Sequence, residues 1–203
     1  MNRLFAVLLF LVALSTVVNA RRTKNSQVAP TCDLWERKCP PGWKPFIREP
    51  RIYICFRIFG IKATYLEAQE VCRKNYNSRV HGIANVEEHM WIKNKAKSLI
   101  PEESSVFWIG ARRKSYCYNK QSKLEDIEEC KDKKLQQFEW DDQLTTEQYL
   151  FTHWNDDVRA PNGKFSNDAP EDCAVMNVDK ESGTIDDRDC SKPAEGFICG
   201  MSV

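Results

Sequence analysis

Nine cysteines, all of them beyond residue 31, constrain the fold of this chain more than any other feature. They are Cys32, Cys39, Cys55, Cys72, Cys117, Cys130, Cys173, Cys190 and Cys199. Disulfides form and persist in oxidising compartments, so this count predicts a stapled extracellular domain if the chain is exported. Because the count is odd, one cysteine is left without an intramolecular partner.

The first 20 residues predict export. Arg3 precedes an uncharged, mostly apolar run from Leu4 to Val18, and the run closes on the small-residue signal Val18-Asn19-Ala20. This is the pattern of a secretory signal peptide, residues 1–20, cleaved after Ala20. The alternative is a membrane-spanning helix, but the run falls short of the ~20 apolar residues that a bilayer core requires. We therefore expect a secreted protein without membrane insertion.

Net charge and chain length further narrow the class of protein. Removal of the leader takes away one basic residue and leaves equal numbers of basic and acidic side chains. A chain near neutrality is a poor partner for nucleic acid, so we expect none. The stretch 21–38 is polar and without periodicity, which predicts a flexible tail, and the remaining length suits one domain with its own core.

Two capped helices are predicted in the first half of the domain. A hairpin leads into the strand-forming run Arg51 to Phe59. Thr64 with Glu67 forms a capping box, and Leu66, Ala68, Val71 and Cys72 supply the apolar face of the helix that follows. Asn85 caps the second helix, in which Ile92, Ala96 and Leu99 keep helical spacing, and Pro101 ends it.

The second half reads as short strands separated by long loops. The strands are expected at 106–110, 138–140, 174–178 and 196–199. Between them lie a charged segment, 112–137, which holds Cys117 and Cys130, and a second loop from Thr152 to Asp172. Loops of this length inside a compact domain are usually functional or disordered, so we expect the second one to carry the function.

Taken in order, a set of motifs resembles the C-type lectin-like domain. The motifs are Cys39-Pro-Pro-Gly-Trp43, the capped helix ending at Cys72, Phe107-Trp-Ile-Gly110, Phe138-Glu-Trp140, Glu171-Asp-Cys173, Asp186-Asp187 before Cys190, and Gly196-Phe-Ile-Cys199. The chain is most similar to a secreted single-domain invertebrate member. The resemblance implies an α+β fold over residues 39–203, with two helices flanking antiparallel sheets and a long disulfide-anchored loop.

The resemblance also implies most of the disulfide pairs. It pairs Cys39 with Cys55, Cys72 with Cys199, and Cys173 with Cys190, while Cys117–Cys130 is our own expectation from their nearness in the charged segment. Cys32 then remains. We expect it to link two chains as a dimer; the alternative is that Cys32 pairs with Cys39 and leaves another cysteine free.

A calcium site in the long loop is the main functional expectation from the resemblance. Sugar-binding members hold Ca²⁺ with Glu-Pro-Asn, a glutamate before a core cysteine, and the Asn-Asp of Trp-Asn-Asp. Here the first string reads Ala160-Pro161-Asn162, with the proline expected to be cis, and the others map to Glu171, Asp186 and Asp187. Four oxygen-bearing positions remain for a hard cation. Ala160 removes one carboxylate, so the implied calcium site, at Asn162, Glu171, Asp186 and Asp187, is degenerate.

Several neighbouring residues complete the candidate site. Trp154-Asn155-Asp156 spells the family's string in the wrong place, and Trp154 is better interpreted as a core anchor. The acids Asp156, Asp157 and Asp168 are either substitutes for the missing glutamate or ordinary solvated loop residues. Phe165 is the one loop aromatic expected to stack on a ligand.

Two functions are consistent with this sequence, and neither is enzymatic. The three histidines lack metal-ligand spacing, and no phosphate loop or nucleophile elbow occurs. The first reading is a secreted C-type lectin that binds a glycan through the degenerate calcium site, in host defence as the family implies. The alternative is a calcium-independent domain that binds an extracellular protein or another surface.

Overall fold

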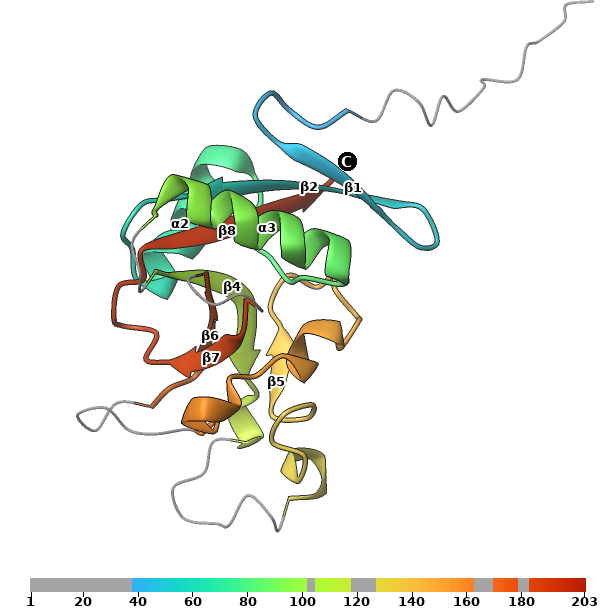
Figure 1. Cartoon of the computed structure of the whole chain (residues 1–203). Helices are drawn as coiled ribbons and strands as arrows, with labels where there is room; N and C mark the ends of the chain where they lie inside the picture. Colours follow the sequence, from blue (N-terminus) through green and yellow to red (C-terminus); the bar gives the residue numbers. More distant parts are fainter. Residues whose placement is uncertain (1–37, 102–104, 118–126, 163–169, 179–182) are drawn as a thin grey trace, which may run out of the picture. The chain divides into compact units, whose positions relative to one another are not determined.

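A strand hairpin and two helices open the folded part of the chain (Figure 1). The computed structural model describes residues 38–101, 105–117, 127–162, 170–178 and 183–203, which belong to one compact unit. The proposed leader, Cys32, Asp168 and the candidate ligand residue Phe165 lie outside the described residues. No helix within the described part is long and apolar enough to cross a bilayer.

The hairpin consists of β1 (Lys44–Arg48) and β2 (Ile52–Phe59). β2 is rich in β-branched and aromatic residues, and successive side chains point to opposite faces. Ile54, Phe56 and Ile58 therefore enter one core cluster, while Cys55 and Phe59 enter a second one. A single strand thus divides the core into two layers.

Helix α2 (Tyr65–Tyr76) has the predicted capping box: the Thr64 side chain accepts from the Glu67 backbone, and the Glu67 carboxylate accepts from the Thr64 backbone. Its buried face is Tyr65, Ala68 and Cys72. The expectation that Leu66 belongs to this face is wrong, since it is 68% exposed. Spacings of three and four residues from Tyr65 place Leu66 on the solvent side.

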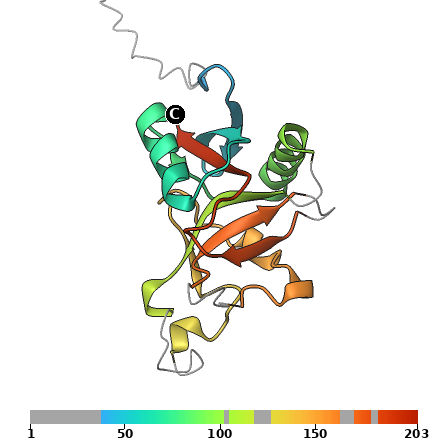
Figure 2. The ribbon, with the colours of Figure 1, turned by 90° about the vertical axis from the view of Figure 1, so that its left-hand side faces the viewer.

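Helix α3 (Val86–Leu99) begins at the predicted cap, where the Asn85 side chain accepts from the Glu88 backbone. Ile92 and Ala96 are buried against the first core cluster, whereas Leu99 is 40% exposed. Figure 2 shows α2 and α3 on opposite sides of the sheet. This is the flanking arrangement expected from the sequence.

The strands form one sheet in the order β1-β2-β8-β4-β6-β7, with β3 paired to β8 and β5 paired to β4. The strands not yet given are β3 (Arg79–Val80), β4 (Val106–Arg113), β5 (Phe138–Trp140), β6 (Cys173–Asn177), β7 (Ile185–Arg188) and β8 (Gly196–Ser202). β4 and β8 run parallel, so the sheet is mixed rather than wholly antiparallel. β3 and β7 were not predicted from the sequence.

Four 3₁₀ turns lie between the strands in the described part of the second half. They are η2 (Ser115–Cys117), η4 (Glu128–Cys130), η5 (Tyr149–Thr152) and η6 (Asp156–Val158). Trp154 follows η5 and is 3% exposed, and its indole N–H donates to the Lys134 carbonyl at 2.9 Å. As expected, it anchors the start of the long loop in the core.

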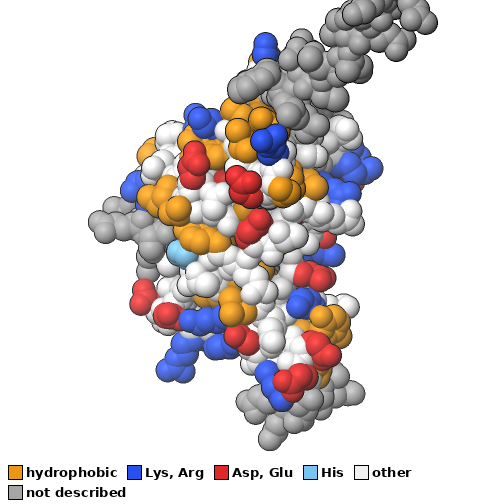
Figure 3. All heavy atoms as spheres, turned by 90° about the vertical axis from the view of Figure 1, so that its right-hand side faces the viewer, with side chains coloured by type: hydrophobic (Ala, Val, Ile, Leu, Met, Phe, Trp, Pro, Cys, Tyr) orange, Lys and Arg blue, Asp and Glu red, His pale blue; other side chains and the backbone are white. Residues whose placement is uncertain are grey.

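The structure contains the four expected disulfides. They are Cys39–Cys55, Cys72–Cys199, Cys117–Cys130 and Cys173–Cys190. The second joins α2 to β8 across the core, and the fourth joins the first residue of β6 to Cys190, which follows β7. On the face shown in Figure 3, basic and acidic side chains are interspersed, as the near-neutral composition leads one to expect.

Candidate ligand-binding site

Two candidate site residues, Asp186 and Asp187, lie in strand β7 rather than in an open loop. Aspartate is depleted in strands, which is why the sequence did not predict this one. β7 pairs with β6, with Asp186 opposite Val175 and Asp187 opposite Ala174. Because side chains alternate along a strand, the two carboxylates leave on opposite faces. Asp187 is 3% exposed, whereas Asp186 is half-buried.

The buried carboxylate of Asp187 is paired with Arg113, a residue that the sequence reasoning did not single out. The Arg113 guanidinium donates to Asp187 Oδ2 at 2.7 Å, and the exposed fractions of the two side chains are 4% and 0%. An ion pair removed from water is stable only when its remaining donors and acceptors are also satisfied.

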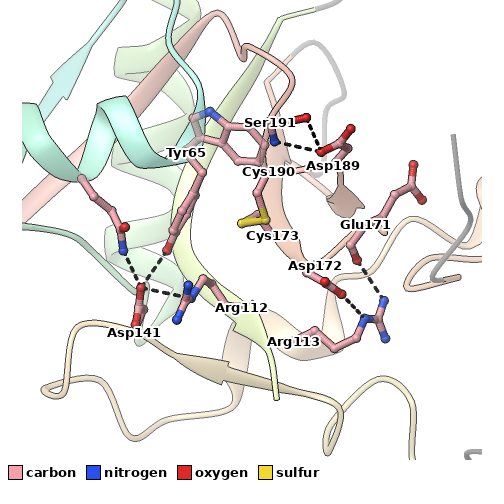
Figure 4. Close-up of a disulfide and its surroundings, with 12 residues drawn as sticks. Tyr65, Arg112, Arg113, Asp141, Glu171, Asp172, Cys173, Asp189, Cys190 and Ser191 are labelled. Atoms are coloured by element: carbon pink, nitrogen blue, oxygen red, sulfur yellow. Dashed lines mark hydrogen bonds and ion pairs between the residues drawn. A yellow bond between two sulfur atoms is a disulfide. The ribbon is translucent and has the colours of Figure 1, made fainter. Parts of the chain in front are cut away.

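Arg113 meets that requirement through further contacts, some of which Figure 4 displays. It donates to the Gln137 side chain at 2.6 Å and to the Glu171 backbone carbonyl at 3.2 Å. Its Nε lies 3.3 Å from the Asp172 carboxylate, and the guanidinium stacks 4.6 Å from the centre of the Phe138 ring. Arg113 therefore joins β4, β5, β7 and the segment before β6.

The loop around Pro161 is tied to the same ion pair. The Ala160–Pro161 peptide bond is cis, as expected. The backbone N–H of Asn162 donates to Asp187 Oδ1 at 2.9 Å, and the Asn162 side-chain amide donates to the Val158 carbonyl at 3.3 Å. Both oxygens of Asp187 thus accept hydrogen bonds from protein groups.

These contacts do not fit a calcium ion at Asp187. Calcium requires six to eight oxygen ligands, but a guanidinium lies against the Asp187 carboxylate, and Ala160, 1% exposed, stands where the family's glutamate would. Within the described ranges, no group of three or more His, Cys, Asp and Glu side chains is arranged to hold a metal. A positive charge is present at this point, and Arg113 supplies it.

A polar pocket of about 520 Å³ opens beside this ion pair. It is lined by Asp157, Val158, Arg159, Asn162, Glu171, Asp186 and Asp187. Burial, with the nearby Asp187 carboxylate, raises the pKa of Asp186 to about 6. At neutral pH this carboxyl accepts hydrogen bonds, and in mildly acidic solution it also donates one. The pocket offers carboxylates, an amide and a guanidinium to a polar ligand.

The structure brings the four expected residues, Asn162, Glu171, Asp186 and Asp187, to one pocket. The sequence reasoning missed Arg113 and Arg159. A signal for Arg113 was available, because Phe107, Ile109 and Ala111 are inward-facing in β4, and period-2 alternation places Arg113 on the same face. Arg159 takes a left-handed backbone conformation with φ 61° at the end of η6, and no motif marked it.

One family model matches this chain, and solved structures share its fold. The sequence profile of a family described as C-type lectin domain-containing protein 141/158 matches residues 52–202. Among solved structures, the C-type lectin CEL-I from Cucumaria echinata is 20% identical with a TM-score of 0.55, covering 80% of this chain and 96% of that one. Human lithostathine is 15% identical with a TM-score of 0.55, covering 82% and 92%.

A third structure is the carbohydrate-recognition domain of cow CD23, solved in the presence of a GlcNAc2Man3 oligosaccharide. It is 20% identical with a TM-score of 0.52, covering 82% of this chain and 97% of that one. At these identities the likeness shows the fold. A comparison with curated protein sequences produced no match.

Proposed function

Because this chain belongs to the C-type lectin domain family, we propose that it is a secreted binding protein, not an enzyme, that recognises a glycan in the Pro161 pocket without calcium. The Pro161 pocket is the one lined by Asp157, Val158, Arg159, Asn162, Glu171, Asp186 and Asp187. The leader predicted from the sequence at residues 1–20 supports secretion, as do four disulfides in the folded domain.

The observation that carries the calcium-independent part is the buried Arg113–Asp187 pair at 2.7 Å. Displacing the guanidinium would leave a buried cation without its partner, which costs several kcal/mol. A calcium ion entering here would have to offset that cost with one oxygen-bearing side chain fewer than the family's site offers. The Arg113 guanidinium therefore replaces the ion. It neutralises the Asp187 carboxylate, which in turn accepts a hydrogen bond from Asn162 in the Pro161 loop.

The chemistry of the Pro161 pocket supports a sugar ligand. Sugar hydroxyls both donate and accept, and charged side chains make the stronger hydrogen bonds to them. Asp157 and Arg159 are exposed on this pocket, so an acceptor and a donor face a ligand together. Among proteins with the same fold, the cow CD23 domain was crystallised with an oligosaccharide.

A glycan array tests the proposal directly. We expect the secreted protein to bind the same glycans in calcium and in excess chelator. Asp157→Asn should weaken that binding, whereas Asp156→Asn is the matched control, because Asp156 lies on the same turn, pairs with Lys134 and does not line the pocket. Binding lost in chelator would restore the calcium-dependent reading. An array without any bound glycan would favour the protein-binding alternative.

We also propose that Cys32 links two chains. The four intramolecular pairs use the other eight cysteines, so Cys32 is the one cysteine of the sequence that they leave over. A disulfide-linked pair would present two Pro161 pockets, and two weak sites gain avidity when a ligand engages both.

A further inference from the structure

A second pocket adjoins the Pro161 pocket along β7, and Glu171, Asp186 and Asp187 line both. It has a volume of about 330 Å³, and its lining includes Val175, Asn177, Asp186, Arg188 and Asp189. Asp186 and Arg188 alternate with Asp187 along the strand, so they point to the face that Arg113 does not occupy. We call this the β7 back pocket. Arg188, Asp189 and Lys192 line this pocket and not the Pro161 pocket.

Asp189 is the unusual group in the β7 back pocket, because it is a carboxylate that is 5% exposed. Its Oδ1 accepts from the backbone N–H and the hydroxyl of Ser191, both at 2.8 Å. Its Oδ2 is buried and has no hydrogen-bond partner in the structure. In Figure 4 this second oxygen points away from Ser191. A buried carboxylate oxygen without a donor is costly and calls for a ligand that donates.

The other charged residues of this pocket limit the charge of that ligand. Asp186 supplies a second carboxylate, Glu171 and the Arg113-paired Asp187 add two more, and Lys192 and Arg188 also contribute to the lining. Arg188 donates to the Pro193 carbonyl at 3.0 Å, which directs its guanidinium towards the 189–193 turn. Because basic side chains also line the β7 back pocket, the pocket suits a ligand with a single positive charge better than a polycation.

An ammonium group matches these acceptors better than a metal does. It carries three N–H donors and no acceptor, and a charge-assisted bond to a carboxylate is stronger than a neutral one. In the part of the chain that the structure describes, no group of three or more His, Cys, Asp and Glu side chains is arranged to hold a metal. The pocket's apolar wall, Val106 and Val175, suits the carbon frame of a small amine.

We propose that the β7 back pocket binds a primary ammonium group, with Asp189 and Asp186 as its acceptors. The group can come from an amino sugar or from a lysine side chain. The two pockets share Asp186, so the ammonium group is assigned to the β7 back pocket by Asp189, which does not line the Pro161 pocket.

The test titrates the full secreted chain with D-glucosamine, N-acetylglucosamine and an Nα-acetylated lysine amide, followed by calorimetry or NMR. We expect glucosamine or the lysine amide to bind and N-acetylglucosamine, which lacks the ammonium, to bind about tenfold more weakly or worse. The stronger of the two amines identifies the source of the ammonium. Equal binding of glucosamine and its N-acetyl form, or no binding of either amine, would overturn the proposal.

Variants locate the site. Asp189→Asn should weaken amine binding about tenfold. Because Asp189 also caps a turn, Asp186→Asn serves as a second variant whose side chain is half-buried and makes one local contact, to the Asp187 backbone at 3.0 Å. Glu139→Gln, an exposed acid on β5, is the control and should bind like the wild type. Amine affinity unchanged in folded Asp189→Asn and Asp186→Asn would contradict the assignment.

Discussion

The guanidinium of Arg113 lies 2.7 Å from the carboxylate of Asp187, and both side chains are almost wholly shielded from water. The other Asp187 oxygen accepts from the backbone of Asn162, next to the cis Pro161. One ion pair therefore connects the middle of the sheet to the loop that lines the candidate site. Its energetics can be measured separately from any ligand.

Removing Arg113 should strongly destabilise the domain. Arg113→Met leaves the Asp187 carboxylate buried without a counter-charge, which costs about 3–5 kcal/mol of unfolding free energy. Urea denaturation followed by circular dichroism measures the loss. The matched control is Arg112→Met, because Arg112 is 52% exposed and pairs with Asp141 at 3.3 Å; an exposed pair contributes about 1 kcal/mol or less. Equal losses in the two variants would show that the Arg113 pair has no special role.

Stability should depend on pH through His81. Burial lowers the pKa of His81 from 6.5, although Asp142 lies 3.1 Å from its Nδ1. The folded state therefore binds the proton less readily than the unfolded chain. The stability that the neutral imidazole contributes is therefore complete above about pH 6.5. It is lost as the pH falls from 6.5 towards the lower pKa that His81 has in the folded state.

The pH prediction is best tested as a difference between two proteins, because other groups titrate in the same range. Burial also lowers the pKa of His89, whereas the pKa of Asp186 is raised to about 6 and acts with the opposite sign. The difference in unfolding free energy between the wild type and His81→Asn should shrink from pH 7.5 to pH 5.5. A difference that stays constant over this range would mean that His81 does not titrate as described.

The two disulfides Cys72–Cys199 and Cys117–Cys130 should differ in their effect on folding. The first closes a sequence separation of 127 residues and the second one of 13. In chain-entropy terms this predicts a loss of about 4–5 kcal/mol for the first and about 3 for the second. Paired Cys→Ala variants, compared by thermal unfolding, measure both. The ranking is wrong if the Cys117/Cys130 variant is the less stable.

The proposed dimer is tested by electrophoresis without reductant. We expect the secreted wild type to run as a covalent dimer that becomes a monomer with reductant, and Cys32→Ser to run as a monomer in both conditions. A Cys32→Ser protein that remains a dimer would place the interchain bridge elsewhere. A wild type that runs as a monomer would argue against any interchain bridge.

Local signals predicted much of the fold. The capping residues Thr64 and Asn85 marked the starts of α2 and α3 correctly, because capping depends on neighbours in the sequence. β7 was missed, since Ile185 to Arg188 has few strand-forming residues and is held in the sheet by its pairing with β6. Leu66 was placed on the wrong face because helical spacing alone does not choose the phase of a short helix.

The sequence identified four residues of the candidate site but not the positive charge that pairs with Asp187. Motif matching located Asn162, Glu171, Asp186 and Asp187, which line one pocket. It could not predict that Arg113, 74 residues before Asp187, would supply the charge. That pairing results from the sheet order, in which β6 lies between β4 and β7. The alternation of β4 could have placed Arg113 on the inward face, but no local signal identifies Asp187 as its partner.

A calcium titration of the wild-type protein by calorimetry, with thermal unfolding in calcium and in chelator alongside, tests the central claim most directly. If Arg113 takes the place of the ion, calcium should produce no stoichiometric heat and no shift of the unfolding temperature. A one-to-one binding heat that disappears in Asp187→Asn, but not in the control Asp156→Asn, would contradict the account.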